Sequence, residues 1–190
     1  MTAAPAGRRP EETEVKLPCA DLDALRAKLR EDGATLRSAR HEESNVLYDD
    51  AKEELSGRGG TLRLRTAASE TILTFKGPAR FEGGIKVREE REVRVSDAAE
   101  AEALLIALGF RPKFRYEKRR EEWDLDDCAI ALDETPIGSF VEIEGDPSAI
   151  RRALQALGLD FSEAIPYTYA ELYRRRRRDD GLRVSSRPGQ

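Results

Sequence analysis

The chain has 190 residues, a length that suits one domain with a substantial core and is short for two. Charged residues make up 37% of it, against roughly 25% in an average domain, so there is more charge than usual to place. The formal net charge of -4 gives no general attraction to nucleic acid or to anionic membranes. No apolar run approaches the roughly 20 residues that a membrane-spanning helix needs.

Cysteine usage and the first residues bear on the compartment. Cys19 and Cys128 are the only cysteines, and they show no paired spacing. Nothing near the N-terminus resembles the apolar core of a secretory signal. We therefore expect reduced thiols and a cytoplasmic location.

Strands are expected after a flexible leader at residues 1–10, wherever charged and less polar residues alternate. The expected strands are 11–17, 35–50 with interruptions, 60–67, 71–77, 85–95, 111–123, 128–135 and 138–145. About eight strands are enough to close a barrel.

Helices are expected between these strands. The ranges 21–33, 96–109 and 146–158 each end on a glycine that can cap the last turn. Ser96 is the expected N-cap of the second helix, and Pro147 suits the first turn of the third. A last helix is expected over 168–178, where it enters a run of arginines.

The segment 174–190 combines that basic run with a polar stretch rich in Gly, Ser and Pro, and we expect it to be a tail without fixed structure. The arginines Arg174 to Arg178 are interpreted as a solvated helix end whose cations suit the C-terminal dipole. Nucleic-acid binding and a positive rim for a binding site are the alternatives.

The strands carry their charges on one parity. In 60–67, for example, Leu62 and Leu64 oppose Arg63 and Arg65. For a single strand, charges in water around an apolar sandwich core would explain this pattern. Since the helices also need an apolar surface to cover, we favour a barrel with an apolar outside and a charged lumen. The proposed lumen holds seven acids and seven bases: Glu12, Glu14, Glu90, Glu92, Asp133, Glu142 and Glu144, with Lys16, Arg63, Arg65, Lys76, Arg88, Lys118 and Arg120.

Such a lumen has a chemical use. Burying many charges for stability alone is unfavourable unless they are paired or solvated. Arg and Lys form charge-assisted hydrogen bonds with phosphate oxygens, while clustered carboxylates are hard ligands for magnesium or manganese. The pattern favours a wet tunnel that binds a polyanion together with its metal ions.

Seven blocks of the sequence, in order, resemble the CYTH proteins, also called triphosphate tunnel metalloenzymes. The first is Glu12-x-Glu14-x-Lys16, which is similar to the ExExK signature of that family. The others are LRLR (62–65), TFKGP (74–78), REEREV (88–93), YEKRRE (116–121), LDETPIGSFVEIEG (132–145) and IPYTYAELY (165–173). The resemblance covers about 11–173, which we take as one tunnel domain.

The resemblance implies an α+β fold, an eight-stranded antiparallel barrel with helices packed outside, and a role for each lumen residue. The triphosphate-binding set would be Lys16, Arg63, Arg65, Lys76, Arg88, Lys118 and Arg120, with Arg88 the least firmly mapped. The metal ligands for Mg²⁺ or Mn²⁺ would be Glu12, Glu14, Glu142 and Glu144. The catalytic candidates would be Lys16, Glu90, Glu92 and Asp133, the three acids acting on the metal directly or through water.

Three functions stay open at this point. The first choice is a metal-dependent phosphohydrolase acting on tripolyphosphate, ATP or thiamine triphosphate. The second is a class IV adenylate cyclase that makes cyclic AMP and pyrophosphate from ATP, and the third is a module that binds a triphosphate or nucleotide without turning it over. We expect neither nucleic acid nor a membrane as a partner, and the resemblance is compatible with a homodimer.

Overall fold

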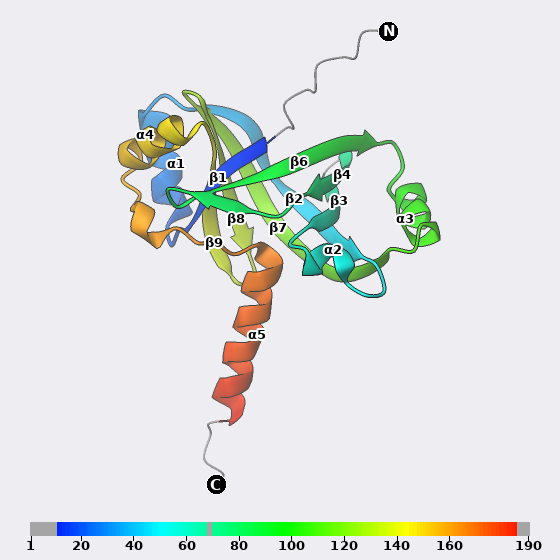
Figure 1. Ribbon diagram of the computed structural model, residues 1–190. Helices are drawn as coiled ribbons and strands as arrows, with labels where there is room; N and C mark the ends of the chain where they lie inside the picture. Colours follow the sequence, from blue (N-terminus) through cyan, green and yellow to red (C-terminus); the bar gives the residue numbers. More distant parts are fainter. Residues whose placement is uncertain (1–10, 68–69, 186–190) are drawn as a thin grey trace.

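The computed structural model describes residues 11–67 and 70–185, with side chains through Arg178 (Figure 1). The strands are β1 (Glu11–Pro18), β2 (Thr35–Asp49), β3 (Thr61–Ala67), β4 (Glu70–Lys76), β5 (Arg80–Glu82), β6 (Ile85–Val95), β7 (Arg111–Leu125), β8 (Cys128–Thr135) and β9 (Gly138–Gly145). The helices are α1 (Leu22–Glu31), α2 (Glu54–Gly57), α3 (Ala98–Ala107), α4 (Pro147–Ala156) and α5 (Tyr169–Ser185), with a 3₁₀ turn at Phe161–Glu163. The expected leader and residues 186–190 lie outside the described residues.

The strands form one antiparallel sheet that closes into a barrel. Their order is β1-β9-β8-β7-β2-β3-β4-β6-β5, and an additional pairing of β1 with β6 joins the ends. The first half of β6 pairs with β1 and β5, and its second half pairs with β4. Eight strands therefore form the wall, as expected from the sequence, and the short strand β5, which was not expected, lies along its edge.

The apolar core lies between the outer face of the barrel and the helices. Val15 and Leu17 of β1 are buried against α1 and α4, in a cluster that includes Ile143 of β9 and Ile150 of α4. A second cluster joins β2 and β3 to α3. Because side chains alternate along a strand, Glu12, Glu14 and Lys16 point the other way, into the barrel. The expected orientation of the charged face is confirmed.

Side chains cap the first turns of α3 and α5. The Asp97 carboxylate accepts the N–H groups of Ala99 and Glu100, so Asp97 caps α3 and the expectation for Ser96 is wrong. In α5, Thr168 and Glu171 form a capping box: the Thr168 N–H donates to Glu171, and the Glu171 N–H donates to the Thr168 hydroxyl.

The last helix is longer than expected. It continues to Ser185, well past the expected end at residue 178, and projects from the barrel in Figure 1. The expected boundary between domain and tail at 173 therefore falls inside a helix.

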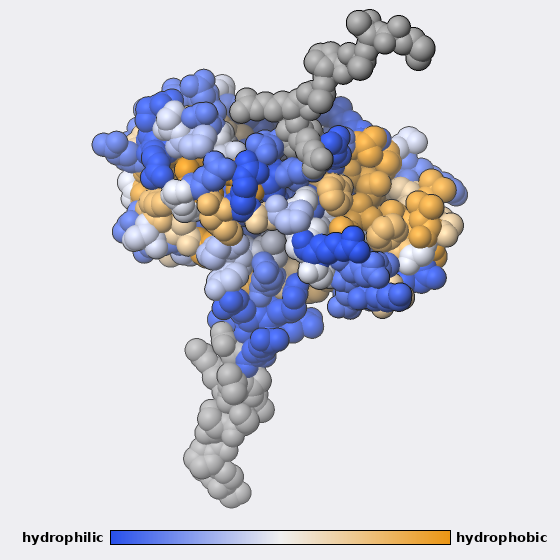
Figure 2. All heavy atoms as spheres, viewed as in Figure 1, coloured by the Kyte–Doolittle hydropathy of each residue, from blue (hydrophilic) through white to orange (hydrophobic). Residues whose placement is uncertain are grey.

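Exposed apolar side chains gather at the α3 end, where Val93, Leu104 and Leu108 are all more than half exposed (Figure 2). Within the described ranges, no helix combines the length and the apolar character required to cross a membrane.

Candidate active site in the barrel

A cavity of about 1230 Å³ runs through the barrel. Every charged residue that the sequence assigned to the lumen lines this cavity, with Asp133 as the one exception. Thr168, which caps α5, and the α5 residues Tyr169, Ala170, Glu171, Arg174 and Arg177 also line it. The cavity wall is thus made of the inward-facing side chains of the strands, together with residues of α2 and α5.

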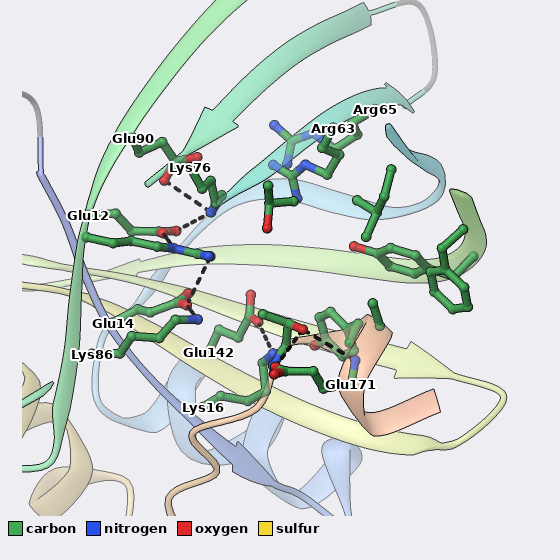
Figure 3. A pocket seen from close by; sticks show the side chains of 18 of the residues that line it. Glu12, Glu14, Lys16, Arg63, Arg65, Lys76, Lys86, Glu90, Glu142 and Glu171 are labelled. Carbon is green, nitrogen blue, oxygen red and sulfur yellow. Dashed lines mark hydrogen bonds and ion pairs between the residues drawn. The ribbon is translucent and has the colours of Figure 1, made fainter. Parts of the chain in front are cut away.

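One charged cluster surrounds Glu12. Its two carboxylate oxygens accept hydrogen bonds from Lys76 Nζ at 2.7 Å and Arg88 Nε at 2.9 Å. Lys76 Nζ also lies 3.1 Å from Glu90 Oε2, and Figure 3 shows these side chains grouped on one side of the cavity. Burial disfavours the charge of Glu12, yet Lys76 and Arg88 outweigh it and lower its pKa. Burial and the nearby Glu12 charge raise the pKa of Glu90.

Glu14 lies next to this cluster. It accepts a hydrogen bond from Lys86 Nζ at 2.7 Å, and Arg88 Nη2 lies 3.7 Å from the same oxygen. Glu14 and Lys86 are opposite each other in the register of β1 and β6. Burial lowers the pKa of Lys86, although Glu14 opposes that effect.

A second cluster is centred on Asp133 of β8, which is fully buried. Its carboxylate accepts hydrogen bonds from Lys118 Nζ at 2.9 Å, from Arg120 Nε at 2.7 Å and Nη2 at 2.6 Å, and from the Tyr169 hydroxyl at 2.5 Å. Burial works against the charge, but Arg120 and Lys118 lower the pKa of Asp133. Asp133 therefore fixes the two bases and the start of α5 from behind the cavity wall.

Lys16 and Glu142 connect this cluster to β1. They are opposite each other in the register of β1 and β9, and their charged atoms lie 3.2 Å apart. Lys16 Nζ also donates to the Tyr167 carbonyl at 3.2 Å and lies 3.9 Å from the centre of the Tyr169 ring. Glu142 additionally accepts from Arg120. Lys16 thus links the first strand to the chain segment that enters α5.

Glu43 of β2 is a buried acid among cations. Lys118 Nζ lies 3.4 Å from one of its oxygens and Arg65 Nη1 lies 3.5 Å from the other. Burial alone would raise its pKa, but Lys118, Arg120 and Arg65 lower the pKa of Glu43 to about 2. Glu43 therefore stays ionised at neutral pH and stabilises the cations around it.

Arg63 and Arg65 of β3 contact their acidic partners only loosely in the cavity wall. Arg65 reaches Glu43 at 3.5 Å and Glu92 at 4.0 Å, and Arg63 reaches Glu92 at 3.6 Å. Arg63 Nη2 donates to Thr74 at 3.3 Å, while its buried Nε has no hydrogen-bond partner within the described structure. Figure 3 shows both side chains together, reaching into the cavity. These guanidinium groups retain donors that an anion can use.

The carboxylates near Glu144 suit a hard cation. Glu14 and Glu144 are opposite each other across β1 and β9. Burial is the main cause of a raised pKa at Glu144, and the negative charges of Glu12 and Glu14 raise it further. The nearby cations therefore do not fully compensate the negative charge of this group of carboxylates. Oxygen donors crowded in this way fit magnesium or manganese. In the residues described, no three His, Cys, Asp or Glu side chains stand together as a ready-made metal centre.

The structure places the expected residues as follows. The acids and bases of the expected triphosphate-binding and metal-binding sets all line one cavity, including Arg88. Asp133 belongs to the same charged interior, but four donors enclose it and it does not reach the cavity. Arg174 and Arg177 line the cavity at its α5 end, so part of the arginine run lies at a rim.

Sequence reasoning missed Glu43, Lys86 and Glu171. Lys86 shares the parity of Arg88 in β6, so the alternation that identified Arg88 was sufficient to identify Lys86 as well. Glu171 completes the T-x-x-E pattern of a capping box, which is visible in the sequence. Glu43 lies in a strand interrupted by register shifts, where parity is harder to follow.

The CYTH domain family model matches residues 10–162. A protein of Methanocaldococcus jannaschii, "Putative adenylate cyclase MJ0240", is 24% identical over 85% of this chain and 97% of its own length. The solved structure of a "putative adenylate cyclase" from Vibrio parahaemolyticus matches with a TM-score of 0.76 and 20% identity, over 87% of this chain and 99% of that one. A further structure carries the description "Putative adenylyl cyclase HpAC1 from Hippeastrum reveals a dominant triphophatase activity". It matches with a TM-score of 0.66 and 18% identity, over 86% of this chain and 95% of its own.

Proposed function

Since the chain belongs to the CYTH family, we propose that it is a divalent-metal-dependent enzyme that hydrolyses a triphosphate inside its barrel. The observation that carries this proposal is that Arg63 and Arg65 are only loosely paired with acids. Both line a cavity rich in charge, and they contact acids only at 3.5 to 4.0 Å. A triphosphate offers oxygens that these guanidinium groups can bind more closely.

Two groups of residues in the cavity wall would have different roles, one in phosphate binding and the other in metal binding. Arg63, Arg65, Lys118 and Arg120 bind and orient the phosphate chain, and Glu43 and Asp133 position those cations. Glu12, Glu14, Glu142 and Glu144 would hold magnesium or manganese, which when bound neutralises charge on the phosphate oxygens. Asp133 is assigned a positioning role, because it does not line the cavity and its oxygens accept from Lys118, Arg120 and Tyr169.

The reaction requires a nucleophile and a proton acceptor. A water oxygen attacks the terminal phosphorus, the bond to the bridging oxygen breaks, and diphosphate leaves when the substrate is tripolyphosphate. We assign Glu90 as the general base that accepts a proton from the attacking water. Its carboxylate lines the cavity and lies 3.1 Å from Lys76 Nζ. The cations around the phosphate chain stabilise the charge that accumulates on the leaving oxygen.

Cyclisation is the second candidate. The same wall would orient the ribose 3′ oxygen toward the α-phosphorus, with pyrophosphate as the leaving group. The name of the Methanocaldococcus relative favours this reaction. The Hippeastrum structure, described as having a dominant triphosphatase activity despite its cyclase name, favours hydrolysis. We therefore place hydrolysis first.

Product analysis tests the choice. Purified protein is incubated separately with tripolyphosphate and with ATP, each with Mg²⁺, with Mn²⁺ and with EDTA. We expect metal-dependent release of phosphate and no more than traces of cyclic AMP. Cyclic AMP as the main product would overturn hydrolysis in favour of cyclisation. Tight triphosphate binding without turnover under either metal would leave the binding module as the correct function.

A further inference from the structure

The inner face of β7 changes character along its length. Glu122, Arg120 and Lys118 form its charged part, and the next two inward positions are Tyr116 and Phe114. Both aromatic residues line the cavity, at the end formed with α2, α5 and the end of β2. Binding a phosphate chain does not require aromatic rings, so this part of the wall needs another explanation.

The two rings present a surface to the cavity. Phe114 and Tyr116 are stacked, with centroids 5.8 Å apart and planes inclined by 29°. Tyr173 of α5 meets Phe114 edge to face at 5.5 Å. Tyr173 does not line the cavity, whereas Phe114 and Tyr116 do. Tyr116 contacts the α5 rings of Tyr169 at 5.8 Å and Tyr173 at 6.1 Å. These contacts pack α5 against β7, and Phe114 and Tyr116 still line the cavity.

Strand register places this surface near Arg63 and Arg65. Leu47 of β2 is opposite Phe114 on one side and Arg63 on the other. Asn45 is likewise opposite both Tyr116 and Arg65. Phe114 and Arg63, like Tyr116 and Arg65, are therefore two strands apart, a backbone separation of roughly 10 Å. Asn45 is fully buried, and neither of its amide atoms has a hydrogen-bond partner in the described structure.

The cavity has room for more than a phosphate chain. Its volume of about 1230 Å³ exceeds the roughly 300 to 1,000 Å³ of most small-molecule pockets. Aromatic side chains bind bases by stacking without selecting among them, because every base has a flat face. Arg174 and Arg177 add positive charge at the same end.

We propose that Phe114 and Tyr116 form a stacking surface for the planar ring of an organic triphosphate, and that they determine a preference for nucleoside triphosphates over tripolyphosphate. This inference rests on the proposed function, since it assumes that the phosphate chain binds along Arg63 and Arg65. The competing explanation is that the rings serve only to pack α5.

The test compares ATP with tripolyphosphate in three variants. For each protein, kcat/KM and the dissociation constant without metal are measured for both molecules, and near-ultraviolet circular dichroism checks the fold. Phe114→Leu removes a ring of the surface, Phe114→Tyr keeps it, and Tyr173→Leu is the matched packing control. We expect the preference for ATP over tripolyphosphate, measured as the ratio of their kcat/KM values and of their affinities, to fall about tenfold or more in Phe114→Leu. In the other two variants this preference should change less than about threefold.

An unchanged ratio in Phe114→Leu would overturn the stacking surface, as would an equal fall in Tyr173→Leu. The ratio of dissociation constants decides the matter even if the wild-type protein turns over neither molecule. That inactivity would count against the proposed function alone. Failure of the proposed function and failure of the stacking surface are thus distinguishable.

Discussion

Replacing Glu43 by Gln removes one negative charge from the most enclosed group of cations. The usual glutamate pKa of 4.5 falls to about 2 in the folded protein, because Lys118, Arg120 and Arg65 outweigh the effect of burial. At about 1.4 kcal/mol for each pH unit, this difference corresponds to about 3 kcal/mol of stability at neutral pH. Because the folded pKa is the lower one, the contribution is complete above 4.5 and is lost as the pH falls toward 2.

Urea unfolding of the wild-type protein and Glu43→Gln, at pH 7 and at pH 3, measures this contribution. We expect the variant to be less stable by about 3 kcal/mol at pH 7 and by roughly 1 kcal/mol at pH 3. Glu42→Gln is the matched control, since its exposed pair with Arg119 should contribute less than about 1 kcal/mol. A small difference in the free energy of unfolding between wild type and Glu43→Gln at pH 7 would refute the assigned role of Glu43. A difference that does not decrease at pH 3 would refute it as well.

Two further substitutions separate positioning residues from metal ligands. Glu144→Gln should reduce metal-dependent turnover by roughly 100-fold or more. The urea midpoint should change little, because the raised pKa of Glu144 means that the fold disfavours its charge. Unchanged turnover, or an unfolded variant, would contradict the role of Glu144 as a metal ligand. Asp133→Asn should lower the free energy of unfolding by about 3 to 5 kcal/mol, since it leaves Lys118 and Arg120 short of a buried partner. A loss below about 1 kcal/mol in the same assay would show that the Asp133 cluster is not a structural anchor.

The barrel and its charged interior were predictable because parity along a strand is a local property. Glu12 and Glu14 occupy one face of β1 whatever the rest of the chain does, and the apolar helices indicate which face must be outside. The order of the strands was not predicted, because period-two alternation does not say which strands pair, and the family resemblance implied only an eight-stranded antiparallel barrel.

Other features depended on contacts that no local pattern contains. Asp133 has the inward parity that the sequence indicates, but its enclosure depends on Tyr169, which arrives from a helix 36 residues later. Ser96 and Asp97 are both good capping residues, and the path of the chain out of β6 decides that Asp97 is the cap. The loose contacts of Arg63 and Arg65 are visible only once the positions of Glu43 and Glu92 are known.

The central claim is that the barrel interior binds a triphosphate through Arg63 and Arg65, whose contacts with acids are loose. Isothermal titration calorimetry of tripolyphosphate into the wild-type protein, Arg63→Met and Arg119→Met tests it directly, because Arg119 is an exposed arginine on the outer face of the same barrel. A charge-assisted hydrogen bond contributes about 1.5 to 3 kcal/mol, so Arg63→Met should bind roughly 10- to 100-fold more weakly while Arg119→Met binds like the wild type. Equal affinity in Arg63→Met and the wild type, or no binding by the wild type, would contradict the claim.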